Sequence, residues 1–226
     1  MSDKFEEIDA SMTQLRLKSS GEQVEPANSH KELVLDPQGD LRLEVGLVPH
    51  SFVVDSRSLA RVSPVWKAML FGGWSESRPN NGQSWVVQLP EDDACAMNVL
   101  LGIIHGNFPR EPNRIAPDQL RLLTTAADKY DIIHLLRPWA PTWIKGLKEN
   151  NINHLEFQTC ITYLCIAWNL GDQVFFESLA EAVLLEAKVD NKGTLLDPSG
   201  NALIEEPLIS HMNIIGKAQL KSSRAS

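Results

Sequence analysis

The chain has 226 residues, of which 43% are hydrophobic and 22% charged, and its formal net charge is −8. This composition is typical of a folded globular protein and disfavours a dedicated binder of naked nucleic acid, whose surface would be basic. A membrane span is not expected, because the longest uncharged apolar run, near Val99–Ile104, is far shorter than the roughly 20 residues that a spanning helix needs.

Residues 1–31 are polar and show no sustained apolar period, so we expect a disordered tail, with a short helix near Ile8–Leu17 as the alternative. This N-terminus is acidic where a secretory signal would have a basic start and an apolar stretch. The three cysteines of the chain are too few for a disulfide framework. Both observations indicate a reducing intracellular compartment, and they do not distinguish cytosol from nucleus.

The second part of the chain, residues 32–146, begins with strand patterns. A short strand is predicted at Leu33–Leu35, followed by a turn at Asp36–Gly39. From Leu41 to Leu47, apolar and polar residues alternate, which predicts a strand with one buried face. Ser51–Val54 returns as the next strand, so the two strands should form a hairpin.

Helix signals follow this hairpin. Asp55 or Ser56 can cap a short helical turn, and Ser63-Pro64 predicts the start of the next helix. Gly72-Gly73 should end that helix. Its apolar stripe is predicted to contain Val65, Trp66, Met69 and Leu70.

The remainder of the second part predicts a strand at Trp85–Leu89 and a helix at Ala94–Ile104. The three carboxylates of Glu91-Asp92-Asp93 are expected in the first turn of that helix, opposite the positive end of its dipole. The helix is apolar nearly all round, so it should lie at the centre of the core. A further helix opens at Pro117, and its predicted stripe is Leu120, Leu123, Ala127 and Tyr130. After Arg137-Pro138, a final turn is expected, flanked by Trp139 and Trp143.

The third part, residues 147–226, predicts an antiparallel pair of helices joined at Gly171-Asp172, a helix stop followed by a cap. A short β-hairpin is expected after them, with its turn at Asp197–Gly200 between Thr194 and Ile204. The buried face of the first helix should carry Leu155, Ile161, Leu164, Cys165 and Trp168. That of the second should carry Val174, Phe175, Phe176, Leu179, Val183 and Leu184.

A series of short motifs follows the predicted hairpin in order along residues 32–146. They are Phe52-x-Val54-x-Ser56-x-x-Leu59, Ser63-Pro64-Val65-Trp66, Met69-Leu70, Trp74-Ser75-Glu76, Val87-x-Leu89-Pro90-x-Asp92-Asp93, Leu100-Leu101-x-Ile103-Ile104-His105-Gly106 and Ala127-Asp128-Lys129-Tyr130-Asp131. Each motif is weak alone, but the ordered series resembles the BTB/POZ domain, in particular its filamentous-fungal branch.

This resemblance implies an α+β fold in which helical hairpins are capped by a small β-sheet. It also implies a protein–protein interaction module at residues 32–146. The Ala167-Trp168-x-Leu170-Gly171-Asp172 step resembles the helical extension of fungal BTB proteins, so residues 147–226 are interpreted as a helical C-terminal extension.

Catalytic motifs are absent from the sequence, which has no Walker loop, no Gly-x-Ser-x-Gly elbow and no His-Glu-x-x-His. We therefore expect no catalytic residues, no cofactor and no metal. Cys160 and Cys165 are five residues apart on different faces of a predicted helix, which favours core packing over a zinc site with His154. His105 and His134 are interpreted as structural.

The candidate interaction residues are Met69, Leu70, Phe71, Trp74 and Glu76. In BTB adaptors a hydrophobic-x-Glu step at this place helps to contact a cullin scaffold, and Trp74-Ser75-Glu76 matches it by position. An exposed aromatic residue can anchor in a partner's pocket, while Glu76 adds orientation and charge selectivity. The alternative is that Trp74 folds back onto the core and Glu76 braces a neighbouring loop.

Three functions are consistent with these residues. The preferred one is a non-enzymatic scaffold that mediates self-association or docks a protein partner. The first alternative is a substrate adaptor of a cullin-type ubiquitin ligase, which would act by proximity. The second alternative, a transcriptional co-regulator, lacks a DNA-binding motif in this chain. The sequence does not decide whether the chain forms a homodimer. No clear strand precedes Glu32 that two copies could exchange, whereas an exposed apolar patch along Val65–Leu70 would favour dimerisation.

Overall fold

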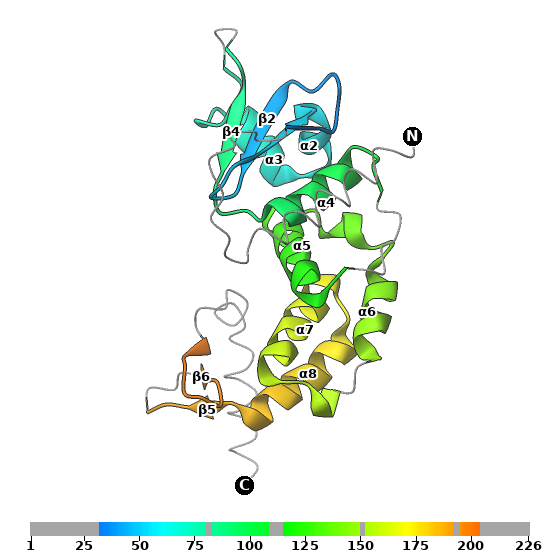
Figure 1. Ribbon diagram of the computed structural model, residues 1–226, viewed down its shortest axis with the longest axis vertical. Helices are drawn as coiled ribbons and strands as arrows, with labels where there is room; N and C mark the ends of the chain where they lie inside the picture. Colours follow the sequence, from blue (N-terminus) through cyan, green and yellow to red (C-terminus); the bar gives the residue numbers. More distant parts are fainter. Residues whose placement is uncertain (1–31, 80–82, 109–114, 150–151, 192–194, 204–226) are drawn as a thin grey trace, which may run out of the picture.

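The computed structural model describes residues 32–79, 83–108, 115–149, 152–191 and 195–203. Within these ranges the chain forms seven α-helices, a four-stranded sheet and a two-stranded sheet, so the predicted α+β class is confirmed. The four-stranded sheet lies at one end of an elongated arrangement, and the helices of the C-terminal half lie towards the other end (Figure 1). The tail predicted at 1–31 lies outside the described residues. No helix in the described ranges is long and apolar enough to cross a membrane.

The four-stranded sheet contains β1 (Leu33–Val34), β2 (Leu41–Val45), β3 (His50–Val54) and β4 (Val86–Leu89), in the spatial order β1-β3-β2-β4. β2 and β3 form the predicted antiparallel hairpin. β4 runs parallel to β2, and β1 runs parallel to β3. β1 and β4 are therefore the two edge strands of this sheet.

The alternation in β2 places Leu41, Leu43 and Val45 on the buried face of the sheet, as the period of two predicts. The prediction that Leu47 continues this face is wrong, because its side chain is 90% exposed. Gly46 has a φ of 90°, a left-handed conformation that glycine adopts readily, and it turns the chain out of the strand. Leu47 consequently lies in the turn between β2 and β3.

Two short helices follow β3, namely α2 (Ser56–Val62) and α3 (Pro64–Phe71). The carboxylate of Asp55 caps α2 by accepting the Ser58 N–H at 2.8 Å. The hydroxyl of Ser63 caps α3, with Pro64 at the first helical position. Both start signals are confirmed, with Asp55 as the cap of the first helix.

The apolar stripe predicted on α3 is confirmed only in part. Trp66 and Leu70 are fully buried, and the Trp66 ring stacks on Tyr130 with centroids 4.4 Å apart and 10° between the planes. Met69 is half-buried against the same core. Val65 is exposed, because consecutive helical residues point about 100° apart and Trp66 already faces inward.

α4 (Ala94–Ile104) lies at the centre of the core, as its nearly continuous apolar sequence predicts. The prediction that Glu91, Asp92 and Asp93 occupy its first turn is wrong. The chain turns after β4, and the helix begins only after Asp93, which is its N-cap and accepts a backbone N–H at 2.8 Å. Dipole stabilisation by three first-turn carboxylates therefore does not apply.

Asp92 has a different role, because its side chain is only 5% exposed. Its Oδ2 accepts the hydroxyl of Tyr130 at 2.6 Å, and its Oδ1 accepts Lys129 Nζ at 2.8 Å. The backbone carbonyl of Tyr130 in turn accepts the Ser63 hydroxyl at 2.6 Å. This network ties the start of α4 and the start of α3 to the end of the next helix.

That helix is α5 (Pro117–Lys129), and the four residues of its predicted stripe are all buried. It is followed by the 3₁₀ helix η2 (Ile133–Leu136) and by α6 (Ala140–Lys148). The expectation of a final turn flanked by Trp139 and Trp143 is wrong. Trp139 is the N-cap position of α6, and Trp143 is buried within that nine-residue helix.

The extension contains η3 (Ile152–His154), α7 (Phe157–Leu170) and α8 (Gln173–Glu186). The predicted helix stop is confirmed, since Gly171 ends α7 with a φ of 77°. The predicted cap is also confirmed, because the carboxylate of Asp172 accepts a backbone N–H at the start of α8 at 2.9 Å. The two helices pack against each other as the predicted pair (Figure 1).

α7 is enclosed by its neighbours, because it packs against both α5 and α8 and every residue from Cys160 to Ala167 is buried. Trp168 and Val174, predicted on inward faces, are exposed instead. They flank the connection at Gly171, at one end of the helix pair. The buried residues of 32–146 and those of the extension form one continuous cluster, and the predicted boundary at 146 falls within α6.

A second sheet follows α8 and consists of β5 (Lys188–Val189) and β6 (Leu195–Leu196), which are antiparallel. The turn predicted at Asp197–Gly200 forms, and an isolated antiparallel bridge closes it. Pairing of β6 with β5 was not predicted. Thr194 and Ile204, expected in the hairpin strands, lie outside the described residues.

Candidate protein-interaction surface

The predicted interaction residues lie on the last turn of α3 and on the segment that follows it. Phe71 and Trp74 are exposed, Trp74 to 68%. Glu76 is half-buried, and so is Met69. Leu70 is fully buried in the core, so it cannot contact a partner in this structure. Phe71, Trp74 and the half-buried Glu76 are together called the aromatic–acidic patch.

Two glycines direct Trp74 away from the helix. Gly72 is the C-cap of α3, and Gly73 has a φ of 83°, so the chain changes direction before Trp74. The indole of Trp74 lies close to the backbone at this bend, because a Cβ at Gly72 would come within 3.0 Å of its Nε1. The bend therefore holds the ring outside the core while limiting its motion.

Ser77 closes the segment back onto the helix end. Its hydroxyl donates to the carbonyl of Met69 at 3.1 Å and accepts the N–H of Gly73 at 3.0 Å. Its own N–H donates to the carbonyl of Trp74 at 3.0 Å. The loop that carries Trp74 is thus fixed by its own hydrogen bonds.

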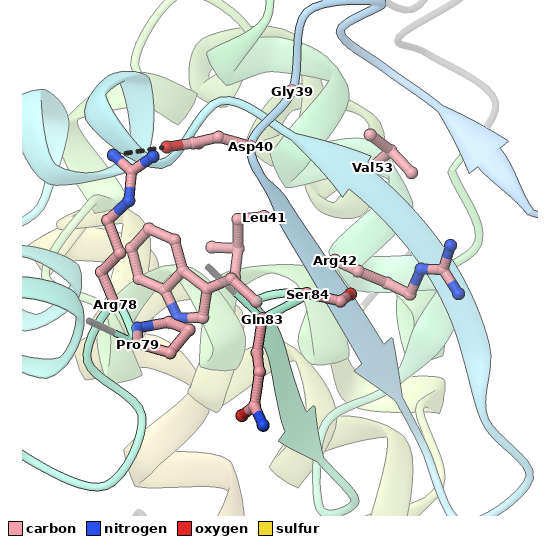
Figure 2. A pocket seen from close by; sticks show the side chains of 10 residues that line it. Gly39, Asp40, Leu41, Arg42, Val53, Arg78, Pro79, Gln83 and Ser84 are labelled. Atoms are coloured by element: carbon pink, nitrogen blue, oxygen red, sulfur yellow. Dashed lines mark ion pairs between the residues drawn. The ribbon is translucent and has the colours of Figure 1, made fainter. Parts of the chain in front are cut away.

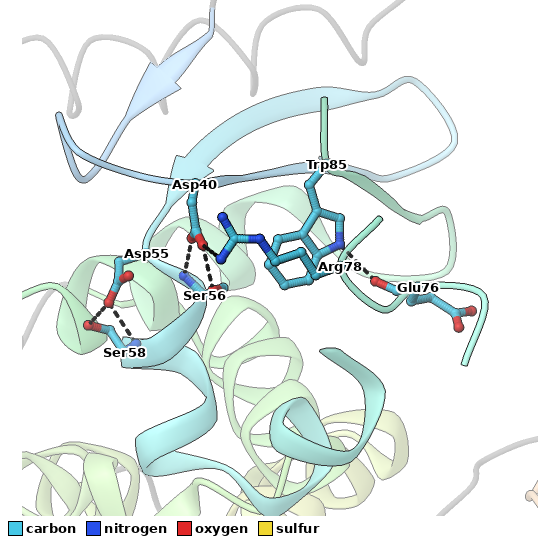
Figure 3. Close-up of polar contacts among 7 residues, drawn as sticks. All are labelled: Asp40, Asp55, Ser56, Ser58, Glu76, Arg78 and Trp85. Atoms are coloured by element: carbon cyan, nitrogen blue, oxygen red, sulfur yellow. Dashed lines mark hydrogen bonds and ion pairs between the residues drawn. The ribbon is translucent and has the colours of Figure 1, made fainter. Parts of the chain in front are cut away.

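The patch also rests on Trp85, the buried residue just before β4. The Nε1–H of Trp85 donates to the backbone carbonyl of Glu76 at 2.8 Å (Figure 3). Its ring meets Phe71 nearly perpendicularly, with centroids 5.9 Å apart and an interplanar angle of 84°. An aromatic contact of this geometry is favourable, so Phe71 is held in place from one side.

A charged pair secures the end of the segment. Arg78 Nη1 lies 3.5 Å from Asp40 Oδ2, and the Arg78 guanidinium stands 5.9 Å from the centroid of the Trp85 ring. Asp40 also accepts the N–H and the hydroxyl of Ser56, at 2.9 and 3.0 Å (Figure 3). The carboxylate of Asp40 therefore joins the start of β2, the start of α2 and the segment that carries the patch.

Glu76 keeps its carboxylate at the surface, where one oxygen accepts the hydroxyl of Ser75 at 2.8 Å. The alternative in which Trp74 folds back onto the core is wrong, because its ring is mostly exposed. Bracing of a neighbour by Glu76 occurs through its backbone carbonyl rather than its side chain. The carboxylate is thereby left at the surface beside an exposed indole.

A cleft of about 340 Å³ lies beside this segment, where β2 and β4 begin and β3 ends (Figure 2). Leu41 and the buried Trp85 line its interior, and Arg42 and Arg78 stand at its rim. Both guanidinium groups have carboxylate partners, since Arg42 pairs with Glu32 at 2.7 Å and Arg78 with Asp40. The cleft therefore carries little excess charge with which to attract a free anion.

Chemically reactive groups elsewhere have structural surroundings. No group of three metal-ligating side chains comes together among the described residues. His105 Nε2 accepts the N–H of Asp55 at 3.0 Å, and its Nδ1 lies 2.8 Å from a carbonyl of α4, which agrees with the structural role predicted for it. Burial raises the pKa of the Cys95 and Cys160 thiols, so both stay protonated and weakly nucleophilic.

Comparison of the sequence with protein-family models found no match, and a search of curated proteins found none at a significant level.

The supports of the patch were not predicted from the sequence. Trp85, Arg78 and Asp40 lie up to 45 positions apart, and no local spacing brings them together. Only the final packing of β4 beside β2 places the Trp85 indole under the segment. The cleft was missed for the same reason, since three strand ends have to meet before it exists.

Proposed function

We propose that residues 32–146 are a BTB/POZ domain and that the chain is a non-enzymatic protein-interaction module. The order of elements supports this proposal. A β2–β3 hairpin is followed by the short helices α2 and α3, then by β4 returning parallel to β2, and then by the central helices. This is the order that the sequence motifs imply for a small sheet capping helical hairpins.

The observation that carries the proposal is the exposed indole of Trp74 on a fixed segment. Tryptophan is enriched among the residues that dominate binding energy at protein interfaces. Because the segment is already ordered, little conformational entropy is lost when a partner binds. A large apolar side chain held in water in this way is best explained by a partner that covers it.

Trp74→Ala tests this function. Captures from a lysate of the source organism would be compared for the wild type, Trp74→Ala and the control Trp168→Ala, which removes another exposed indole from α7. We expect at least one protein that the wild type and Trp168→Ala retain and Trp74→Ala loses, with unchanged circular dichroism. Identical captures from all three proteins would contradict a binding role for Trp74.

A second candidate is the substrate adaptor of a cullin-type ubiquitin ligase. The observation that favours it is the surface carboxylate of Glu76, two residues after the exposed Trp74. The indole would enter an apolar pocket of the cullin, and the carboxylate would select a basic neighbour of that pocket. The chain would supply no catalytic residue and would hold a substrate near the transfer machinery.

Light scattering with a cullin N-terminal domain tests this candidate. We expect a complex with the wild type and with the control Glu91→Gln, which neutralises another exposed glutamate. The Trp74→Ala/Glu76→Ala variant should lose the complex while keeping its fold. If the wild type forms no complex at concentrations well above micromolar, the adaptor function is excluded, whereas the more general interaction function is not.

A further inference from the structure

One edge of the four-stranded sheet carries unpaired backbone groups. The carbonyl of Trp85 accepts the N–H of Arg42 in β2, and that of Leu89 accepts the N–H of Gly46 just after β2, at 2.9 Å each. Trp85 and Leu89 therefore direct their backbone groups towards β2. Backbone direction alternates along a strand, and the N–H and C=O groups of Val86 and Gln88 therefore point away from β2. Within the described part of the chain, no other strand pairs with β4.

Among the residues that the structure describes, this edge lacks three usual protections: charged side chains, proline and a bulge. Natural sheets block exposed edges with charged side chains, proline, bulges or very short strands. Residues 84–89 include no charged residue and no proline, and the β2–β4 register runs without a bulge. Val86 is 41% exposed, and Gln88 is also exposed. The opposite edge differs, because β1 has only two residues.

We propose that β4 pairs antiparallel with β4 of a second copy of this chain, through a two-fold axis at Val87. This inference rests on the proposed function, of which it specifies one form of self-association. In that register Val86 lies opposite Gln88 of the second copy, and each donates its N–H to the other's carbonyl. Symmetry repeats the pair, so four backbone hydrogen bonds form and the two sheets become continuous.

A second copy fits this edge because the edge is complementary to itself. The two residues with outward-directed backbone groups are separated by one residue, which is the spacing that a two-fold antiparallel pair requires. No like charges meet, since the strand is uncharged. The side chains of Val86 and Gln88 stand on the same exposed face of the sheet, where an aliphatic and an amide side chain would pack side by side.

The surrounding surface extends the contact beyond the strand. A four-residue strand buries less than the roughly 1,200–2,000 Å² of a standard interface. Phe71 is exposed and touches Trp85, the residue immediately before β4, so apolar surface continues from the edge. We therefore expect a reversible dimer whose population rises with protein concentration.

Val86→Lys and its matched control Val34→Lys test the proposal in the full-length chain. Val34 is 42% exposed on β1, the opposite edge of the same sheet, and both variants change the net charge equally. Sedimentation would be measured over a concentration series. We expect a wild-type dimer, a dissociation constant raised about tenfold or more by Val86→Lys, and no change with Val34→Lys. Val86→Lys/Gln88→Lys should abolish the dimer, because lysines would face each other directly across the pair at roughly 5 Å.

Amide hydrogen exchange gives a second readout that does not depend on a variant. We expect the N–H groups of Val86 and Gln88 to become protected as the dimer forms and to exchange rapidly in dilute solution. A chain that stays monomeric at the highest concentration would overturn the proposal. So would a dimer that survives the double lysine variant, or protection of both amides at every concentration, which would show that the chain covers its own edge.

Loss of the β4 pairing and loss of partner binding are separate experimental outcomes. Val86→Lys leaves the exposed indole of Trp74 in place, so a Trp74-dependent partner should still bind when the dimer is lost. Dimerisation through another surface would overturn the β4 pairing and leave the interaction function intact.

Discussion

The buried pair of Asp92 and Tyr130 allows the contribution of a single hydroxyl group to the free energy of unfolding to be measured. Tyr130→Phe removes the 2.6 Å hydrogen bond to Asp92 Oδ2 and keeps the ring that stacks on Trp66. The Ser63 bond is also kept, because it goes to the backbone carbonyl of residue 130. The substitution therefore changes one interaction in an otherwise unchanged core.

The expected loss of unfolding free energy is about 1.5–3 kcal/mol, the range for a hydrogen bond to a charged group. Both partners are buried, so water cannot easily replace the lost donor. Lys129 is the other partner of the carboxylate, but its side chain is 46% exposed. Lys129→Met should consequently cost less than Tyr130→Phe, because an exposed ammonium group gains less from its ion pair than a buried donor gains from its hydrogen bond.

Urea denaturation followed by tryptophan fluorescence would measure both variants, with Tyr130→Phe/Lys129→Met completing a cycle. We expect Tyr130→Phe to be clearly the more destabilising of the two single changes. An equal loss, or a larger loss for Lys129→Met, would refute the argument that burial decides the strength of these bonds.

The same residue predicts a dependence on alkaline pH. Burial, together with the hydrogen bond and charge of Asp92, raises the pKa of Tyr130 well above its ordinary value of 10.0. The folded state therefore favours the neutral phenol. Its contribution is complete below about pH 10 and declines as pH rises further, because the unfolded chain then releases the proton first. The stability difference between the wild type and Tyr130→Phe should narrow above that pH, and a constant difference would contradict this linkage.

Three further substitutions have defined outcomes. Gly39→Ala should lower the unfolding free energy, measured by thermal denaturation, by about 1–3 kcal/mol, because the added Cβ would lie 2.8 Å from the Val54 carbonyl oxygen. The control Gly146→Ala has open space around the added Cβ and should not destabilise the fold. Arg78→Ala should change global stability by less than about 1 kcal/mol, yet amide exchange at 74–77 should accelerate; unchanged exchange would show that the Asp40 pair does not hold the patch. Burial alone would raise the pKa of Asp172, but hydrogen bonds from Lys148 and the Phe175 N–H lower it below 3.8. Asp172→Ala should therefore lower the unfolding free energy by about 1 kcal/mol at neutral pH. The difference in unfolding free energy between this variant and the wild type should become smaller as the pH is lowered below 3.8.

Local signals predicted most of the elements. Ser63-Pro64 and Gly171-Asp172 act within one helical turn of themselves, so nearby sequence suffices to place them. Asp92 was misassigned because its partner Tyr130 lies 38 positions away, and only tertiary packing decides whether a carboxylate faces a dipole or a phenol.

The candidate site shows the same division. The sequence pattern placed Trp74 and Glu76 on a segment between a helix and a strand, and the structure agrees with that position. Whether the indole turned inward or outward depended on the bend at Gly72-Gly73 and on the Trp85 indole beneath the loop. Residue types alone predict neither the geometry of this bend nor the hydrogen bond between Trp85 and Glu76, which are 9 positions apart.

The burial of α7 between α5 and α8 limits how this protein can be divided. A fragment ending at 146 would stop inside α6 and remove the helix that covers one side of α5. Residues 32–146 and the extension should then unfold in a single cooperative transition, and neither half should fold without the other. A chimera that transfers the aromatic–acidic patch to another protein will therefore need residues 32–186 as one unit. For the same reason, a destabilising substitution in the extension, far from Trp74, would reduce the fraction of molecules in which the patch is folded.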